Sequence, residues 1–298
     1  MALITFETPF FSAAKAKDAA RQLSLPLRVL NITDAYLTML RDPPCGYGKN
    51  MNPCMDCHAL MFRTAGGIMR AEGADFLFSG EVLGQRPMSQ TRQSLRYVEK
   101  HSGYDGYILR PLSARLLMET MPEKESLVHR EQLLDISGRG RKRQMALARE
   151  FGITDYPAPA GGCLLTDVGY SKRLKDLFDH EDTRRESDFH LLKYGRHLRL
   201  ASGAKIIVGR TFSDNKFLEE YHDPSKDHLL RLYQRPGPIV LVTAGADSAT
   251  VRLAASLCVG YSKAPQNTSV QVLVQAPGRE ERIPVLGVSP DLFKRFLL

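Results

Sequence analysis

The sequence predicts an α/β protein in which a parallel-sheet domain is followed by a smaller α+β domain. Its 298 residues suffice for two domains, and a hydrophobic share of 43% suffices for their cores. In the first half, short apolar runs alternate with helix-like stretches, which is the pattern of a parallel sheet. We therefore expect a first domain over residues 1–167, a helical linker over 168–189 and a second domain over 190–298.

The first elements form a series of strand, helix, strand and helix. Apolar Ala2–Phe6 and Leu27–Ile32 indicate two buried strands. The alanine-rich stretch Ala13–Leu23 predicts a helix with Ser12 as its cap, and Asp34–Leu40 predicts a second helix.

A long helix, two strands and two shorter helices complete the expected first domain. The long helix runs from about His58 to Glu72, and the strands lie at Asp75–Phe78 and Tyr107–Leu112. The shorter helices are expected at Glu131–Leu134 and in the stretch that ends at Phe151.

The polar loop at residues 79–90 follows the strand Asp75–Phe78. Because ligands of parallel sheets bind at the carboxyl ends of strands, we expect this loop to line the active site. A loop that merely connects two elements is the alternative. The candidate substrate-binding residues are Lys49, Glu81, Gln85 and Arg86.

The second half shows a different pattern. A charged helix is expected at Tyr170–Arg185, and then a compact α+β module with an exposed C-terminal tail. The expected strands are Lys205–Arg210, Pro238–Val242 and Val270–Val274, and the expected helix is Ala249–Tyr261. The loop Ala244–Ser248 faintly resembles a pyrophosphate-binding SGGxDS loop but lacks its paired glycines, and Asp247 fits a helix cap better.

Three cysteines form the leading candidate site. Cys54 and Cys57 stand in Asn52–Cys57, where Pro53 indicates a tight turn that enters a helix. Since a helix N-terminus favours thiolate, we expect lowered thiol pKa values there. Cys163 follows two glycines, and we expect it to meet the pair. A lone C-x-x-C also fits a reducible dithiol, half a zinc site or two buried structural cysteines.

Charge and the lack of targeting signals limit the location and the partners that we expect. Met1–Phe11 lacks the features of a signal peptide, and no stretch is apolar enough for a membrane span. Five cysteines without an export signal indicate a reducing cytoplasm, which also disfavours haem attachment at Cys54–His58. A net charge of +8 favours a polyanionic partner such as RNA or DNA, although an ordinary solvated surface explains it too.

The densest basic run feeds the helix that ends at Phe151. Arginine beside flexible glycine suits contact with phosphate, and a solvated helix start explains the same residues nearly as well. The candidate RNA-binding residues are Arg139, Arg141, Lys142 and Arg143.

Long strings in the first half resemble the tRNA 2-thiouridine synthases, which are PP-loop ATPases of the adenine nucleotide alpha hydrolase type. These strings are Gly46–Cys54, Gly80–Gln90 and Pro159–Asp167, and the resemblance covers roughly residues 1–167. The second half, over about 190–298, resembles the NFACT-R type of RNA-binding module. Gly203–Arg210, Asp214-Asn215 and Tyr261–Lys263 carry that likeness.

The resemblance implies a tRNA sulfurtransferase. ATP, with Mg²⁺, would activate a tRNA uridine, and sulfur from a donor protein or sulfide would then displace AMP. Cys57 and Cys163 match the catalytic cysteines, and with Cys54 they match the ligands of a 4Fe–4S cluster in many members. Without a cluster, Cys163 would carry a persulfide and Cys57 would resolve it.

The chain departs from this family at its start. The SGGxDS loop should precede the strand Ala2–Phe6, so the parallel-sheet domain is expected to be N-terminally incomplete. Either the start is assigned too late, or ATP chemistry has been lost. A non-catalytic RNA-binding protein with a degenerate nucleotide domain is therefore the main alternative, and a zinc or redox dithiol protein is a third.

Overall fold

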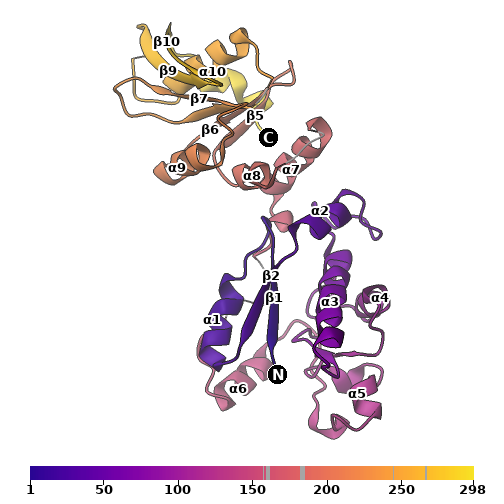
Figure 1. The fold of residues 1–298 in the computed structure, drawn as a ribbon. Helices are drawn as coiled ribbons and strands as arrows, with labels where there is room; N and C mark the ends of the chain where they lie inside the picture. Colours follow the sequence, from indigo (N-terminus) through magenta and orange to yellow (C-terminus); the bar gives the residue numbers. More distant parts are fainter. Residues whose placement is uncertain (157, 159–161, 182–184, 244, 266) are drawn as a thin grey trace. The chain divides into compact units, whose positions relative to one another are not determined.

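The protein is described by a computed structural model that covers residues 1–156, 158, 162–181, 185–243, 245–265 and 267–298. The chain divides into two compact units, Met1–Thr166 and Asp167–Leu298 (Figure 1). Each unit is described by itself.

The first unit begins with a parallel strand pair. Strand β1 (Leu3–Glu7) lies beside β2 (Leu27–Asn31), with Leu3 opposite Leu27. Helix α1 (Ala14–Leu23) connects the two strands, and α2 (Thr33–Arg41) follows β2. These four elements occur where the sequence predicts them. The predicted cap at Ser12 is wrong, because the residue at the cap position is Ala13, whose side chain has no hydrogen-bonding atom.

Helix α3 (Cys54–Ala71) is the long helix of this unit, and it packs against α4 (Arg92–Ser102). It begins four residues before the predicted start at His58, since the amide of Cys57 already donates to the carbonyl of Pro53 at 2.8 Å. Cys54 and Cys57 therefore lie in its first turn.

A second parallel pair consists of β3 (Leu77–Phe78) and β4 (Ile108–Leu109). Both strands are shorter than predicted. Within the described residues, the parallel strands of this unit form two separate two-stranded sheets. The mixed α/β class is confirmed, but the parallel strands do not form the single sheet that was expected.

Short elements complete the first unit. The predicted helix Glu131–Leu134 is only a 3-10 turn, and the basic run leads into a helix as predicted. The elements are η1 (Ala114–Leu116), α5 (Met121–Lys124), η2 (Arg130–Gln132), α6 (Lys142–Glu150) and η3 (Leu164–Thr166). Of the string Pro159–Asp167, residues 159–161 lie outside the described residues.

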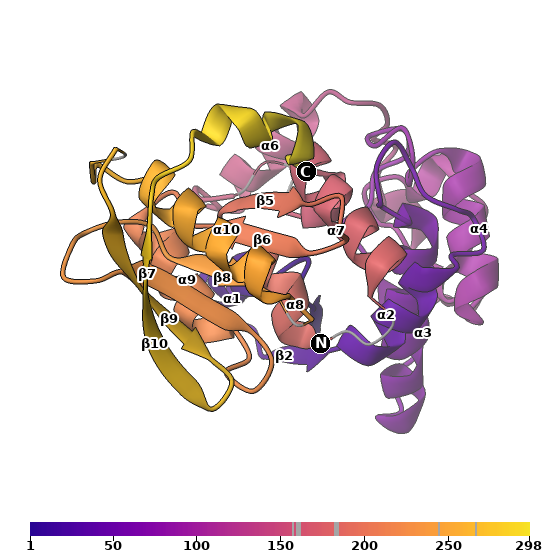
Figure 2. The ribbon, with the colours of Figure 1, turned by 90° about the horizontal axis from the view of Figure 1, so that it is seen from above.

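The second unit is built on a six-stranded antiparallel sheet with the order β10-β9-β7-β8-β6-β5 (Figure 2). Helix α10 (Ser248–Gly260) covers one face, and α8 (Glu186–Leu191) and α9 (Phe212–Tyr221) cover the other. The strands are β5 (Arg196–Arg199), β6 (Lys205–Val208), β7 (His228–Leu232), β8 (Val240–Val242), β9 (Val270–Ala276) and β10 (Arg279–Val285).

Burial on both faces explains the apolar run in β6. Ile206 and Val208 pack in the cluster that includes α10, whereas Ile207 packs with α8 and α9. Alternate side chains of a strand point to opposite faces, so a strand covered on both sides becomes a continuous apolar run.

The remaining helix is shorter than predicted. Helix α7 (Val168–His180) is capped by Asp167 and ends before the predicted Arg185. The C-terminal segment η4 (Pro290–Phe296) has no buried residue, as predicted, and Leu297 after it bridges to Leu198 of β5. The cap reading of Asp247 is confirmed, because its carboxylate accepts from the amide of Thr250 at 2.8 Å.

Candidate functional sites

Three cysteine thiols lie together in the first unit. Cys54 and Cys57 occupy the first turn of α3, and Cys163 comes next to them through the turn that holds η3. The amide of Leu164 donates to the carbonyl of Phe10 at 2.9 Å, which ties Cys163 to the segment after β1. The charge of each of the other two thiols raises the pKa of Cys57, so the three are electrostatic neighbours.

Burial controls the ionisation of these thiols. Burial raises the pKa of Cys57 far above its ordinary value, and the nearby Cys163 raises it further, while a hydrogen bond from Tyr36 acts in the opposite direction. Burial also raises the pKa of Cys163 to about 11. The predicted lowering of the thiol pKa at the helix N-terminus is therefore wrong for Cys57, because desolvation outweighs the helix dipole.

Tyr36 of α2 is a neighbour of the cysteines that sequence reasoning missed. Its side chain is buried, hydrogen-bonds to Cys57 and has a raised pKa because of burial and the thiols. Phe10 and Phe11 hold the ring, with centroid distances of 5.5 and 5.4 Å. No motif marks a tyrosine inside an ordinary amphipathic helix, so only the fold reveals it.

The thiol arrangement does not by itself make a metal site. Among the described residues, no group of three or more His, Cys, Asp or Glu side chains could hold a metal ion. The thiol of Cys54 accepts a hydrogen bond from the side-chain amide of Asn52 at 3.2 Å. The 4Fe–4S cluster stays a prediction.

A buried ion network lies beside the cysteine site. One oxygen of Glu81 lies 2.8 Å from Nδ1 of His58, and the other accepts from Nε of Arg110 at 2.8 Å. Burial raises the pKa of Glu81, but His58 and Arg110 outweigh it and lower this pKa to about 2. Glu81 is thus an ionised carboxylate whose two oxygens are both occupied. Glu81 was a predicted substrate-binding residue, and His58 directly follows Cys57, so the sequence marked two of the three members of this network.

The other predicted substrate-binding residues lie apart from one another. Lys49 is exposed, and Gln85 donates to Gln144 of α6 at 2.9 Å. Arg86 lies near enough to Cys163 for its charge to lower the pKa of that thiol against the effect of burial. Of these residues, Arg86 is the one that the structure brings to the cysteines.

The predicted RNA-binding run lies at the start of α6 in the first unit. Arg139 and Lys142 are exposed. Arg143 forms an ion pair with Asp135 at 2.7 Å, and the guanidinium of Arg141 lies 5.5 Å from the ring centre of Tyr156.

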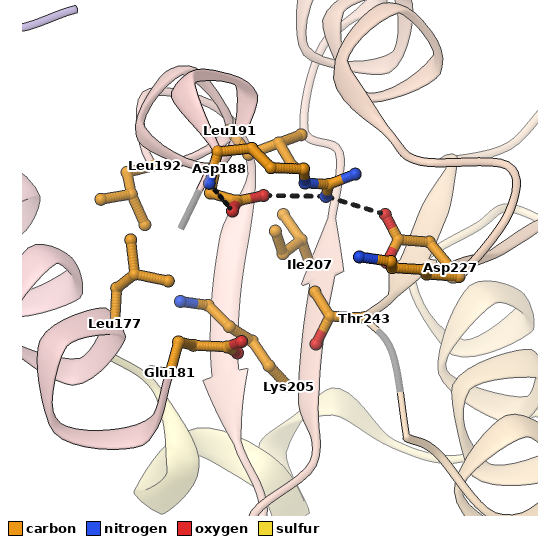
Figure 3. A pocket seen from close by; sticks show the side chains of 11 residues that line it. Leu177, Glu181, Asp188, Leu191, Leu192, Lys205, Ile207, Asp227 and Thr243 are labelled. Atoms are coloured by element: carbon orange, nitrogen blue, oxygen red, sulfur yellow. Dashed lines mark hydrogen bonds and ion pairs between the residues drawn. The ribbon is translucent and has the colours of Figure 1, made fainter. Parts of the chain in front are cut away.

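The second unit has a cavity of about 290 Å³ between α7, α8 and the sheet (Figure 3). Leu177, Leu191 and Ile207 supply apolar walls, and Arg185 bridges Asp188 and Asp227 at 2.9 and 3.9 Å. Positive and negative groups are thus mixed on its wall.

Lys205 is the buried cation of this cavity. Its ammonium lies 3.1 Å from Asp176, and burial lowers its pKa although Asp176 opposes the shift. Arg199 binds the same carboxylate through two nitrogens, at 2.9 and 2.8 Å. These contacts attach α7 to the sheet.

Exposed aromatic and basic side chains share the surface of the second unit. Phe212, the first residue of α9, is 86% exposed. The guanidinium of Arg282 on β10 lies 3.8 Å from the ring centre of Tyr233. Aromatic rings and arginine planes are the groups on which unpaired bases stack. Sequence reasoning did not single out these residues.

A family model and solved structures are similar to this chain. Residues 195–297 match the family model of the NFACT protein RNA-binding domain. The search of curated proteins found no match. The C-terminal structure of the fibronectin/fibrinogen-binding protein from Streptococcus suis is similar at 15% identity and a TM-score of 0.29, covering 82% of this chain and 94% of that chain. In the part of the chain that the structure describes, no helix is both long and apolar enough to cross a membrane.

Proposed function

We propose that this protein binds RNA through its second unit. The observation that carries the proposal is the match of residues 195–297 to the NFACT RNA-binding domain, a range that runs from β5 to the end of η4. Arg282 with Tyr233, and the exposed Phe212, supply the kinds of side chain that contact phosphates and bases.

Titration of labelled tRNA with the full chain tests this proposal. We expect saturable binding whose logarithmic affinity falls linearly with the logarithm of salt concentration. Arg282→Ala should weaken binding several-fold and lower the salt slope by about 0.9 if its cation meets one phosphate. Arg28→Ala, an exposed cation of the first unit, is the control and should change neither. Absence of saturable binding at low salt would contradict the proposal.

A second candidate function, thiolation of a tRNA uridine, is supported by the three neighbouring thiols. In this proposal ATP adenylates the uridine oxygen, and the terminal sulfur of a Cys163 persulfide attacks the activated carbon as AMP leaves. Cys57 then attacks the Cys163 sulfur, and the electron pair of the broken S–S bond leaves on the thiouridine. A donor protein supplies the persulfide sulfur, and an external thiol reduces the resulting Cys57–Cys163 disulfide.

The raised thiol pKa values set a requirement on this chemistry. With a pKa of about 11, roughly one Cys163 thiol in 3,000 is ionised at pH 7.5. The charge of Arg86 already lowers this pKa against the effect of burial. Persulfide transfer to Cys163 therefore needs a further positive charge, from a bound substrate or donor, to stabilise the thiolate.

Nucleoside analysis of tRNA from cells that express the chain tests thiolation. We expect a thiolated uridine with the native chain and its loss in Cys163→Ser, whereas Cys45→Ser should retain it. Iron and acid-labile sulfide are measured on the same anaerobically purified protein, and about four of each per chain would replace the persulfide route by the cluster. If only tRNA binding is found, the non-catalytic RNA-binding function remains.

A further inference from the structure

The two parallel strand pairs of the first unit each leave both of their edges without a partner strand. Among the described residues β1 pairs only with β2, and β3 pairs only with β4. Parallel strands normally belong to larger sheets that are covered on both faces, and an isolated pair of strands is marginally stable. Two such pairs in one compact unit are therefore unusual.

A cavity of about 680 Å³ lies between the two pairs. Residues 1–6, which include most of β1, form one wall, and residues 76–80, which include β3, form the opposite wall. The floor is an apolar face of α3, to which Met61, Phe62, Ala65, Ile68 and Met69 contribute. We call this cavity the strand slot.

The strands on the two walls run in the same direction. Just beyond β3, Glu81 binds His58 in the first turns of α3. Just beyond β1, the backbone carbonyl of Phe10 accepts a hydrogen bond from the amide of Leu164. Cys163, which precedes Leu164, lies close to Cys57 at the same end of α3. Both strands therefore end near the N-terminus of α3, and a strand between them could run parallel to both.

The backbone of β1 has hydrogen-bonding groups directed at the slot. The amide of Leu3 donates to Pro26 at 2.9 Å, and Glu7 accepts from Ile32 at 3.2 Å, so the odd-numbered residues face β2. In a parallel strand, alternate residues face opposite neighbours. Ile4 therefore directs its N–H and C=O groups toward the slot, as does Phe6.

The backbone of β3 is arranged in the same way. The amides of Leu77 and Ser79 donate to the carbonyls of Tyr107 and Leu109, at 2.9 and 3.0 Å. Phe78, which lies between them, thus directs its backbone groups away from β4. Its side chain is 46% exposed although it is a large apolar group.

We propose that the strand slot binds one extended polypeptide segment from outside residues 1–298. The segment adds as a parallel strand between β1 and β3. It thereby joins the two strand pairs into one sheet with the order β2-β1-segment-β3-β4. It is about five residues long, because β1 has five residues and a strand rises about 3.3 Å per residue. It has apolar side chains on its α3 side, to match the floor of the slot. This inference is independent of both proposed functions.

Hydrogen exchange of the full chain tests the slot, with a synthetic peptide that has a Val-Ile-Val-Leu-Val core between lysine pairs as the probe. We expect saturable binding and about tenfold or greater protection of the amides of Ile4, Phe6 and Phe78. The same peptide with proline at its centre is the control and should not protect them. Protection confined to β10 or to the outer edges of β2 and β4 would overturn the proposal.

Proline substitutions separate strand addition from other binding. Ile4→Pro and Phe78→Pro each remove one slot-facing donor but keep the bonds to β2 and β4, so the chain without peptide should keep its melting temperature. Each should weaken peptide binding by at least about threefold. Thr5→Pro, which removes a donor that faces β2, should destabilise the chain without peptide.

Three results would overturn the proposal. The first is a loss of stability in Ile4→Pro as large as that in Thr5→Pro, which would mean that the Ile4 amide already has a partner. The second is peptide affinity that neither proline changes. The third is a concentration-dependent dimer, in the absence of peptide, that protects the same amides, because a second copy would then fill the slot. If neither slot-facing proline variant folds, the exchange pattern of the native chain decides alone.

Discussion

Arg110 and Glu81 form a buried ion pair at the rim of the cysteine site. The side chain of Arg110 is only 1% exposed, and its guanidinium binds both Glu81 and Glu99. Burying a charge is costly unless it is paired and hydrogen-bonded, so each partner depends on the other. His58 completes the contacts of Glu81. The network therefore fixes the loop after β3 relative to the first turns of α3.

The depressed pKa of Glu81 predicts a pH dependence of stability. Its pKa is about 2 in the folded chain, against about 4.3 for an unfolded glutamate. Since the folded-state pKa is the lower one, this contribution is complete above about pH 4.3 and is lost as pH falls toward 2. The full loss is roughly 3 kcal/mol, and we expect roughly 2 kcal/mol of it between pH 6 and pH 3, measured by denaturant unfolding at pH 6, 4 and 3.

Glu81→Gln is the control for this prediction. The amide keeps the size of the carboxylate but does not titrate, so the loss of stability between pH 6 and pH 3 should be smaller by roughly 2 kcal/mol in this variant. Equal pH profiles for the native chain and Glu81→Gln would contradict the depressed pKa.

Helix α3 is the element on which the first unit depends. Its first turn presents Cys54 and Cys57, its apolar face forms the floor of the strand slot, and its middle packs against α4. Close packing around this helix also depends on Gly66, because a Cβ there would lie 2.2 Å from the ring of Tyr104.

Adjacent glycines of α3 give a matched pair of variants. Glycine costs about 0.5–1 kcal/mol relative to alanine inside a helix, and a Cβ added at Gly67 would meet no atom within 4 Å. Gly67→Ala should therefore stabilise the chain by about 0.5–1 kcal/mol. Gly66→Ala should destabilise it by about 1–3 kcal/mol, because the ring of Tyr104 must move. Thermal unfolding measures both, and the same sign for the two variants would disprove the close packing.

The local sequence pattern was enough to predict some strands but not others. The run Leu27–Asn31 is predictable because three of its five residues are aliphatic and helices flank it. Strand β5, with the sequence Arg-His-Leu-Arg, has one aliphatic residue and becomes a strand only through its pairing with β6. Strand β10 is mostly exposed and charged, but Pro277-Gly278 before it is a turn signal, and Gly278 has a φ of +73°.

The sequence likewise predicted some residues of the cysteine site and missed others. The sequence strings singled out Cys54, Cys57 and Cys163, and the fold places their thiols near one another. Tyr36 and Arg110 escaped prediction because their contacts join helices and strands that are distant in the sequence. The thiol pKa values escaped too, since burial depends on the whole unit and outweighs the local effect of the helix N-terminus.

At the scale of the whole molecule, the candidate chemistry and the RNA-binding match lie in different units. The cysteines belong to Met1–Thr166, and residues 195–297 belong to the second unit. Linking two RNA-contacting units raises the effective concentration of the second contact once the first is made. The basic run at the start of α6 is the candidate contact of the first unit, so its effect on tRNA binding tests whether both units engage one RNA.

Replacing Arg139, Arg141, Lys142 and Arg143 together by alanine tests this basic run. If each cation neutralises one phosphate, the slope of logarithmic affinity against logarithmic salt should fall by up to about 3.6, and affinity at low salt should fall with it. The control replaces Lys15, Lys17, Arg21 and Arg28, four exposed cations of the same unit, so both variants lose the same charge. Titration of labelled tRNA at several salt concentrations measures both. A run that contacts phosphates lowers the slope far more than the control does, whereas equal slopes for the two variants would mean that net charge alone attracts the RNA and that the first unit makes no contact through α6.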